Sequence, residues 1–292
     1  MVERTRLDFE LVRAGLARSR RHAAELIAAG RVRVDGVAAG KSSTPLTAGQ
    51  ALDVAPHPEG APTYASRGGH KLAGALDAMG EDGPRITGRA CLDAGASSGG
   101  FTDVLLRRGA ARVVALDVGH DQLIPALRGD PRVEVREGVN VRNLVRGDLD
   151  PAPALVVGDL SFISLTLVLP ALVAVAAPGA DLFLLVKPQF EVGRERLGPG
   201  GVVRDPGLRA QAVRGVARAG AALSLRAAAV VASPLPGPGG NVEYFIWLVE
   251  DDRDNAGDGV AEEVEDVAEH VERAVVAGPT GDGAGWTSGG EA

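Results

Sequence analysis

The pattern of hydrophobic and polar residues divides the chain into a small N-terminal part and a larger part built on another plan. In the small part, apolar residues at helical spacing predict two helices, each ended by a glycine. Period-two alternation predicts a β-hairpin with an Asp-Gly turn and one further strand. These elements span residues 7–14, 20–29, 31–37 and 51–54. We expect a small α+β domain over 1–60 and a proline-containing linker over 61–66.

In the larger part, short apolar strands alternate with amphipathic helices. The expected strands are 89–92, 112–117, 133–135, 154–158, 181–186, 228–232 and 241–249. The expected helices are 72–79, 101–108, 121–127, 165–176 and 205–219. This alternation is typical of a mostly parallel, Rossmann-like α/β sheet. We therefore expect one seven-stranded α/β domain over 67–250, with its ligands at the carboxyl ends of the strands.

A glycine-rich turn links the first of these strands to its helix and predicts a site for a nucleotide-like cofactor. Glycines allow a sharp turn and close approach of a ligand, and a helix N-terminus offers unpaired N–H groups. An acid at the end of the second strand is expected to bind ribose hydroxyls. The candidate cofactor-binding residues are Asp93, Gly95, Ser97, Gly99, Gly100, Phe101, Asp117 and Asp159.

Three functions compete for this turn. A nicotinamide dehydrogenase would have Gly-x-Gly-x-x-Gly, but Ser97 stands at the second glycine. Gly-x-Ser-x-Gly of an α/β-hydrolase fits formally, yet the downstream histidines, His120 and His270, are poorly placed for the required triad order. The third candidate is an S-adenosylmethionine-dependent methyltransferase, in which Asp93 precedes the turn and Asp117 holds the ribose.

Four charged residues at other element ends favour the methyltransferase. They are Lys71, Asp159, Lys187 and Glu243. Methylating an alcohol requires removal of a hydroxyl proton, which a suitably placed lysine can perform while carboxylates orient it. We expect Lys187 to be the general base, oriented by Asp159 and Glu243, with Lys71 placing the hydroxyl or lowering the proton affinity of Lys187. We expect no metal. Taken alone, a lysine or an acid at a strand end is more often a surface or salt-bridge residue, and it is the set of four that favours catalysis.

Charge separates the chain into a basic body and an acidic tail. The net charge is −7, but residues 250–292 carry −11 and the remainder +4. Residues 1–41 hold nine Lys and Arg against five Asp and Glu, so this part is a candidate for contacting a phosphate backbone, the alternative being a solvated basic face. The candidate RNA-binding residues are Arg4, Arg6, Arg18, Arg20, Arg21, Arg31, Arg33 and Lys41.

Other features bear on the compartment and on the tail. The single cysteine, Cys91, suits a reducing cytoplasm, and residues 1–6 do not predict a signal peptide. The stretch 165–186 is almost free of charge and long enough to span a membrane, but Pro178-Gly179 and Asp181 divide it into a helix, a turn and a strand. In the acidic tail, 251–292, valines at helical spacing predict a helix over 260–276 that docks on the body.

The N-terminal part resembles the S4-like RNA-binding domain of ribosomal proteins. The motifs that carry this resemblance are Arg6-Leu7-Asp8, Gly15-Leu-Ala-Arg-Ser-Arg and Gly30-Arg-Val-Arg-Val-Asp-Gly. The resemblance implies contact with structured RNA.

The larger part resembles a family of RNA-modifying enzymes. Lys71, Asp159, Lys187 and Glu243 are similar to the Lys-Asp-Lys-Glu tetrad of FtsJ-like ribose 2′-O-methyltransferases. The whole of 4–276 resembles the TlyA family, on Ser66-Arg-Gly-Gly-His-Lys71-Leu, Gly158-Asp-Leu-Ser-Phe-Ile-Ser164, Val186-Lys-Pro-Gln-Phe-Glu191 and Gly240-Asn-Val-Glu-Tyr-Phe. The family linker resembles Arg-Ala-Trp-Val, where this chain has Pro62-Thr63-Tyr64-Ala65.

This resemblance implies a seven-stranded methyltransferase sheet and a cytoplasmic enzyme, which we expect to be monomeric. It implies S-adenosylmethionine-dependent 2′-O-methylation of cytidine in ribosomal RNA of the large subunit and, in some members, of the small subunit. Two alternatives remain: a non-catalytic RNA-binding ribosome assembly factor, and a membrane-active haemolysin, since the family also carries that label.

Overall fold

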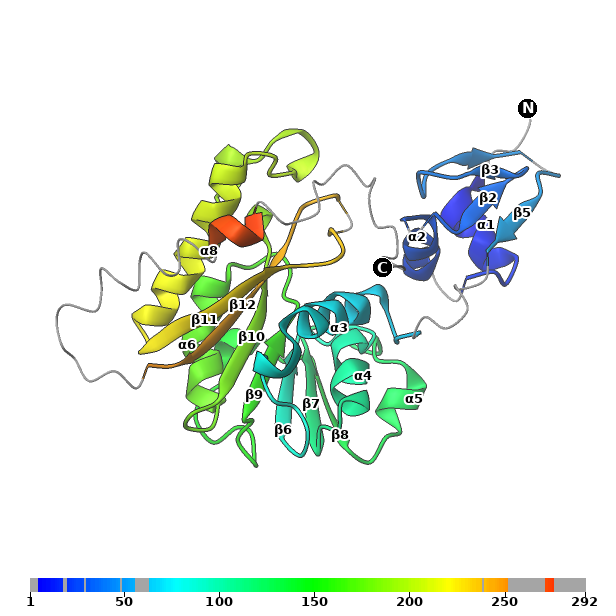
Figure 1. Cartoon of the computed structure of the whole chain (residues 1–292). Coiled ribbons are helices and arrows are strands. Elements are labelled where there is room, and N and C mark those ends of the chain that lie inside the picture. Colours follow the sequence, from blue (N-terminus) through cyan, green and yellow to red (C-terminus); the bar gives the residue numbers. More distant parts are fainter. Residues whose placement is uncertain are drawn as a thin grey trace. The chain divides into compact units, whose positions relative to one another are not determined.

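The computed structural model describes residues 5–17, 20–28, 30–47, 49–55, 63–237, 239–251 and 271–275. The chain divides into two compact units between Ser66 and Arg67, and both are drawn in Figure 1. Outside the described residues lie Arg4, Arg18, residues 56–62 and most of the acidic tail, and for Arg21 only the backbone is described.

The N-terminal unit is a small α+β fold. Its elements are β1 (Thr5–Arg6), α1 (Leu7–Arg13), α2 (Arg20–Ala28), β2 (Val32–Val34), β3 (Val37–Ala38), β4 (Pro45–Leu46) and β5 (Leu52–Val54). The strands β3, β2 and β5 form an antiparallel sheet, as the alternating pattern predicts, and β1 pairs with β4 in a second short ladder. Leu7, Leu11 and Val32 are fully buried in the core of this unit.

The larger unit is built on a seven-stranded sheet in the order β11-β12-β10-β9-β6-β7-β8. The strands are β6 (Ala90–Ala94), β7 (Arg112–Asp117), β8 (Val133–Glu137), β9 (Leu155–Gly158), β10 (Asp181–Val186), β11 (Leu225–Ala232) and β12 (Tyr244–Glu250). Neighbours from β10 to β8 are parallel, whereas β12 is antiparallel to both β10 and β11. The predicted seven-stranded, mostly parallel α/β fold is confirmed.

Helices cover both faces of this sheet (Figure 1). One layer contains α3 (Arg67–Met79), α4 (Gly100–Arg107) and α5 (Pro125–Arg128), and the other contains α6 (Leu165–Val175) and α8 (Pro206–Ala221). Shorter turns are α7 (Pro188–Glu191) and the 3₁₀ segments Gly80–Asp82, Val141–Asn143, Arg194–Arg196 and Pro199–Gly201. Because the central strands are covered on both faces, they are continuously apolar rather than alternating.

Residues 271–275 of the tail are helical and pack on the larger unit. Val271 is fully buried and Ala274 nearly so, within the hydrophobic core that includes α6 and α8. This part of the predicted tail helix therefore docks on the body as expected. The rest of that helix lies outside the described residues.

Two predicted helices have wrong bounds. The first begins at Arg67 rather than at residue 72, because Gly68-Gly69, weak helix formers, are held in α3 by packing that buries Gly69. The helix predicted over 121–127 is only the short α5, since Asp121 has φ +54° and Pro125 starts the helix at its first position. Strand ends differ by smaller amounts.

Candidate active site

The carboxyl edge of the sheet brings together the four predicted catalytic residues. Asp159 follows β9 and Lys187 follows β10, as the strand pattern predicts. Glu243 precedes β12, and because β12 is antiparallel its first residues lie at the edge where the parallel strands end. Lys71 comes from α3. One chemical site is thus assembled from three strands and a helix.

These residues form two lysine–carboxylate pairs. Lys187 Nζ lies 2.5 Å from Asp159 Oδ1 and donates to Ser161 Oγ at 2.7 Å. Lys71 Nζ forms an ion pair with Glu243 Oε2, and these two residues are only 5% and 1% exposed. Glu243 therefore pairs with Lys71, whereas the sequence led us to expect that it would orient Lys187.

Gln189 extends the second pair. Its Nε2 is 3.4 Å from Glu243 Oε1, and it lies two residues after Lys187 on the short helix α7. Gln189 therefore links the loop that carries Lys187 to the buried Lys71–Glu243 pair. The sequence analysis left it out of the site, although it stands in the quoted Lys-Pro-Gln-Phe-Glu motif.

Two glycines make room for the Lys71–Glu243 pair. A Cβ on Gly74 would lie 2.8 Å from Pro234 Cγ, so the missing side chain lets α3 approach the loop after β11. A Cβ on Gly237 would lie 2.4 Å from Glu243 Oε1. Lys71 is the fifth residue of α3, and its amino group pairs with the carboxylate of Glu243.

The glycine-rich turn lies against the same edge. Gly95 has φ +86°, and a Cβ there would lie 2.9 Å from the carbonyl oxygen of Asp159. Gly99 precedes α4 with φ +94°, and Gly100 is the first residue of that helix. Gly95 and Gly99 both need to be glycine, since the left-handed region is unfavourable for other residues and neighbouring atoms already occupy the space of a Cβ.

Asp117 organises the turn from the end of β7. Its Oδ2 accepts a hydrogen bond from Ser97 N at 2.8 Å and its Oδ1 accepts one from Gly119 N at 2.7 Å. Ser97 Oγ donates to the amide oxygen of Gln122 at 3.0 Å, which is not the nucleophile–histidine contact of a hydrolase. Ser97 is a turn residue with φ +47°.

Two further cofactor candidates lie beneath the turn rather than on its surface. The ring of Phe101 is in the core, with its centroid 5.9 Å from that of Phe245, so only its backbone can face a ligand. Asp93 is fully buried and accepts a hydrogen bond from Thr102 Oγ1 at 2.7 Å. Burial, and to a smaller extent the carboxylates of Asp159 and Asp117, raises the pKa of Asp93 to about 7.

An exposed aromatic residue adjoins the lysine pairs and was missed by the sequence analysis. Phe162 follows Ser161, is 91% exposed and has φ +64°, a left-handed backbone that is unusual for a bulky residue. Its ring centroid is 5.3 Å from that of Phe190. The sequence does hint at this residue, because an aromatic side chain stands between Ser161 and Ile163 shortly after the end of a strand.

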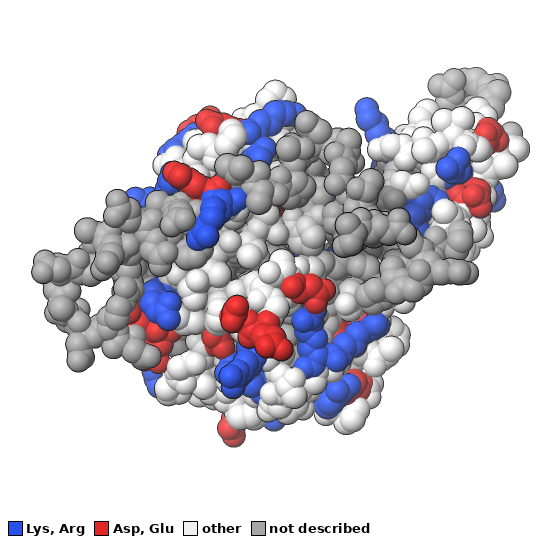
Figure 2. Space-filling model, viewed as in Figure 1, with Lys and Arg blue, Asp and Glu red and all other residues white. Residues whose placement is uncertain are grey.

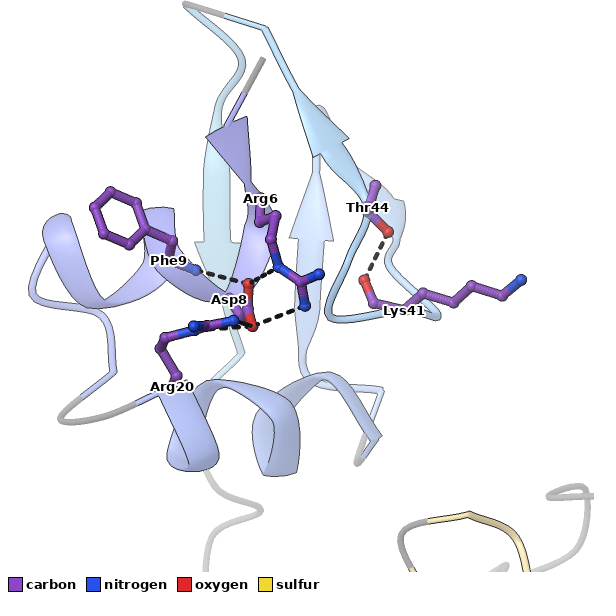
Figure 3. A network of polar contacts seen from close by, with 6 residues as sticks. All are labelled: Arg6, Asp8, Phe9, Arg20, Lys41 and Thr44. Atoms are coloured by element: carbon purple, nitrogen blue, oxygen red, sulfur yellow. Dashed lines mark hydrogen bonds and ion pairs between the residues drawn. The ribbon is translucent and has the colours of Figure 1, made fainter. Parts of the chain in front are cut away.

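The N-terminal unit brings some of the predicted RNA-binding residues together. Arg6 and Arg20 share the carboxylate of Asp8 (Figure 3). Lys41 is exposed on the loop that follows β3. Arg31 directs its guanidinium to the carbonyl oxygen of Ala55, and Arg33, on the sheet, is exposed and donates to the carbonyl oxygen of Gly36.

The fold and the site together define a Rossmann-like methyltransferase domain. A dinucleotide-binding sheet is parallel throughout, whereas here β12 is antiparallel and inserts between β10 and β11. The lysine–carboxylate pairs beside the glycine-rich turn distinguish the site from that of a dehydrogenase or a hydrolase.

Comparisons with known proteins give the family. Residues 64–250 match the FtsJ-like methyltransferase family, and residues 5–52 match the S4 domain. The chain is 57% identical over 248 residues to "16S/23S rRNA (cytidine-2'-O)-methyltransferase TlyA" of Mycobacterium tuberculosis, covering 85% of this chain and 91% of that one. It is 35% identical to "Hemolysin A" of Brachyspira hyodysenteriae, covering 84% and 99%. The chain belongs to the TlyA family of FtsJ-like methyltransferases and carries an S4 domain.

Solved structures agree with this assignment. A hemolysin-named protein from Streptococcus thermophilus is 32% identical, with a TM-score of 0.67 and coverage of 94% of this chain and 98% of that chain. Within the described ranges, no helix combines the length and the apolar character needed to cross a membrane.

Proposed function

We propose that this enzyme transfers a methyl group from S-adenosylmethionine to the ribose 2′-hydroxyl of a cytidine in ribosomal RNA. The observation that carries the proposal is the pair of lysine–carboxylate contacts, Lys187–Asp159 and Lys71–Glu243, at the same sheet edge as the glycine-rich turn. The name of the Mycobacterium tuberculosis relative supports cytidine as the target, and relatives named for 23S RNA or for both RNAs make the large subunit the first expected substrate and the small subunit the second.

The turn suits S-adenosylmethionine. At Gly95 the backbone of the turn packs directly against Asp159, where a Cβ would collide with the carbonyl oxygen. We propose that Gly95, Gly99 and Gly100 hold the amino-acid part and that Asp117 receives the ribose hydroxyls. When bound, the cofactor supplies an electrophilic methyl group on a sulfonium sulfur.

The two lysine–carboxylate pairs have different roles toward the ribose hydroxyl. Lys187 Nζ, held by Asp159 and Ser161, is placed to accept the hydroxyl proton as the oxygen attacks, once the ammonium has released its own proton to solvent. Lys71, fixed by Glu243, is placed to donate a hydrogen bond that orients the same oxygen. No metal is needed for either step.

Phe162 provides a surface for the nucleotide. Its exposed ring, backed by Phe190, stands immediately after Ser161 and can stack on a base that has left its helix. We propose that the S4 domain docks on folded RNA, and that the protein acts as a monomer in the cytoplasm.

Methyl transfer to purified ribosomal subunits tests the proposal. The protein is incubated with labelled S-adenosylmethionine and each subunit, and the RNA is digested to nucleosides. We expect labelled 2′-O-methylcytidine. A methylated base would contradict ribose chemistry, and RNA binding without any transfer would support a non-catalytic assembly factor instead.

A further inference from the structure

A buried carboxylate lies among the candidate RNA-binding cations of the N-terminal unit. Asp8, in the first turn of α1, has a side chain only 6% exposed. Arg6 reaches it from β1 through Nε at 3.0 Å and Nη2 at 3.1 Å, and Arg20 reaches it from α2 with Nη2 at 2.8 Å. Figure 3 shows the two guanidinium groups meeting at this one carboxylate from different elements.

The two arginine side chains are exposed to solvent, whereas the aspartate that they share is buried. The side chains of Arg6 and Arg20 are 52% and 60% exposed, whereas the acid between them is buried. Phe9 N also donates to Asp8 Oδ1 at 3.0 Å, which fixes the carboxylate to the helix start. The hydrogen bonds of Arg6, and then of Arg20, lower the pKa of Asp8 to about 2, so the acid is ionised at neutral pH.

A third cation belongs to the same region. The loop carrying Lys41 is tied to the start of α1 by hydrogen bonds from Leu7 N to Thr44 O at 2.9 Å and from Asp8 N to Ser42 O at 3.1 Å. The loop that carries Lys41 is thus anchored at the helix start where Arg6 and Arg20 meet, while the Lys41 side chain points away from these two arginines (Figure 3).

We propose that Asp8 is a positioning residue for RNA binding, which holds Arg6 and Arg20 as a preorganised pair of guanidinium groups for a phosphate of ribosomal RNA. This inference rests on the proposed function. Arginine suits it because the planar fork remains charged and keeps a fixed geometry toward oxygen anions. Holding both side chains before the RNA arrives reduces the conformational entropy lost on binding.

The proposal runs against simple electrostatics. Removing an acid from a surface that binds a polyanion should strengthen binding, because net attraction increases. On the face visible in Figure 2, Lys and Arg lie beside Asp and Glu, which fits selection of the binding groups by their geometry. If Asp8 positions the arginines, its removal weakens binding instead.

The chain offers a matched control on the same helix. Glu10 also pairs with an arginine, Arg13, but their hydrogen bonds are on the exposed surface and do not involve Arg6 or Arg20. Glu10→Gln removes the same charge, two residues away, without releasing the proposed pair.

Affinity of the full-length protein for a ribosomal RNA transcript, measured over a range of salt concentrations, tests the inference. We expect Asp8→Asn to bind roughly tenfold more weakly and its log–log salt slope to fall by about one, the loss of one phosphate contact. Glu10→Gln should bind as well as the unmodified protein or better. Unchanged or tighter binding by Asp8→Asn would overturn the inference, whereas failure of the unmodified protein to bind RNA would overturn the proposed function.

Two further variants separate positioning from folding. In an Arg6→Ala, Arg20→Ala background, Asp8→Asn should cost no further affinity, because its effect passes through the arginines. An equal loss in that background would show that Asp8 only stabilises the domain and would overturn the inference. Replacing both Arg6 and Arg20 by lysine keeps the positive charges and Asp8 but removes the planar guanidinium groups. This variant should bind RNA about as weakly as Asp8→Asn. Unchanged RNA affinity would contradict the inference.

Discussion

The two units use ion pairs in opposite ways. At the sheet edge of the larger unit, the cations Lys71 and Lys187 are 5% and 7% exposed, so the amino groups are withdrawn from solvent. In the N-terminal unit the carboxylate of Asp8 is buried, and the cations Arg6 and Arg20 are exposed. A lysine amino group can give up its proton, whereas a guanidinium remains charged and presents a fork. The contrast matches the two roles we propose, proton transfer at the sheet edge and docking on RNA by the N-terminal unit.

The largest effect is expected from breaking the buried Lys71–Glu243 pair. Lys71→Met leaves Glu243 buried without its cation, which should lower the free energy of unfolding by about 3–5 kcal/mol. Methyl transfer should fall on the order of 100-fold or more. Urea unfolding and initial rates measure the two effects.

A double variant shows whether the pair serves chemistry or only stability. Lys71→Met combined with Glu243→Leu removes both charges and should recover much of the stability, since apolar replacements of buried pairs are often tolerated. The methyl-transfer activity should stay low. Recovery of activity together with stability would contradict a role for the pair in the reaction.

Gly95→Ala should mainly damage cofactor binding. The new Cβ would lie 2.9 Å from the Asp159 carbonyl oxygen, at φ +86°. Backbone strain of about 1–3 kcal/mol corresponds to a roughly 10- to 100-fold weaker affinity for S-adenosylmethionine, measured by calorimetry. Gly147→Ala is the control, because Gly147 has φ +93° but a Cβ there would meet nothing within 4 Å. Equal cofactor affinities for both variants would argue against the proposed cradle.

Substitution of Phe162 should affect RNA and spare the cofactor. Phe162→Ala should raise KM for RNA about tenfold, since stacking on an aromatic ring contributes roughly 1–3 kcal/mol per base. Phe162→Gly should do the same while leaving the melting temperature unchanged or higher, because glycine tolerates φ +64°. Val145→Ala removes another exposed apolar side chain and should leave KM unchanged. A normal KM for Phe162→Ala would exclude stacking.

Two buried acids have opposite pKa shifts, and replacing them should change how stability depends on pH. Asp93 has its pKa raised to about 7 by burial, so the folded state retains a proton that the unfolded chain releases. Its contribution to stability is complete below about pH 4 and is lost as pH rises through 7, at up to about 1.4 kcal/mol per unit. Asp93→Asn should flatten this dependence between pH 5 and 8.

Asp8 should behave in the opposite direction. Its pKa is lowered to about 2, chiefly by Arg6, so its contribution is present above the ordinary aspartate pKa of about 4 and is lost as pH falls through 2. Acid unfolding of the N-terminal unit should be less steep for Asp8→Asn, followed by far-ultraviolet circular dichroism. Identical acid-unfolding curves for Asp8→Asn and the unmodified protein would argue against the Arg6–Asp8–Arg20 contacts.

Much of the fold could be predicted because strand and helix periods alternate clearly. The direction of β12 could not be derived from hydrophobic spacing, although the loop after β11 contains no helix, a sign of an antiparallel connection. The start of α3 depends on packing of Gly69 and Gly74 against the rest of the unit, which local helix propensity opposes.

The site residues could be selected by type and position at strand ends, but not their pairing. Lys71 and Glu243 are 172 positions apart, and only the folded chain shows that they meet. Phe162 was missed because strand and helix patterns do not report exposure or a left-handed backbone. Asp8 was overlooked because a search for RNA-binding residues by positive charge passes over the acid that holds them.

Single-turnover methyl transfer by Lys187 variants tests the central claim most directly. Lys187→Ala removes the proposed base, and Lys187→Arg keeps the charge but has no group that can accept the proton. Both should lose at least about 100-fold in rate, while affinities for S-adenosylmethionine and ribosomal RNA stay within about twofold of the unmodified protein. Transfer at the normal rate by either variant, with both ligands bound, would contradict the proposal that Lys187 activates the ribose hydroxyl.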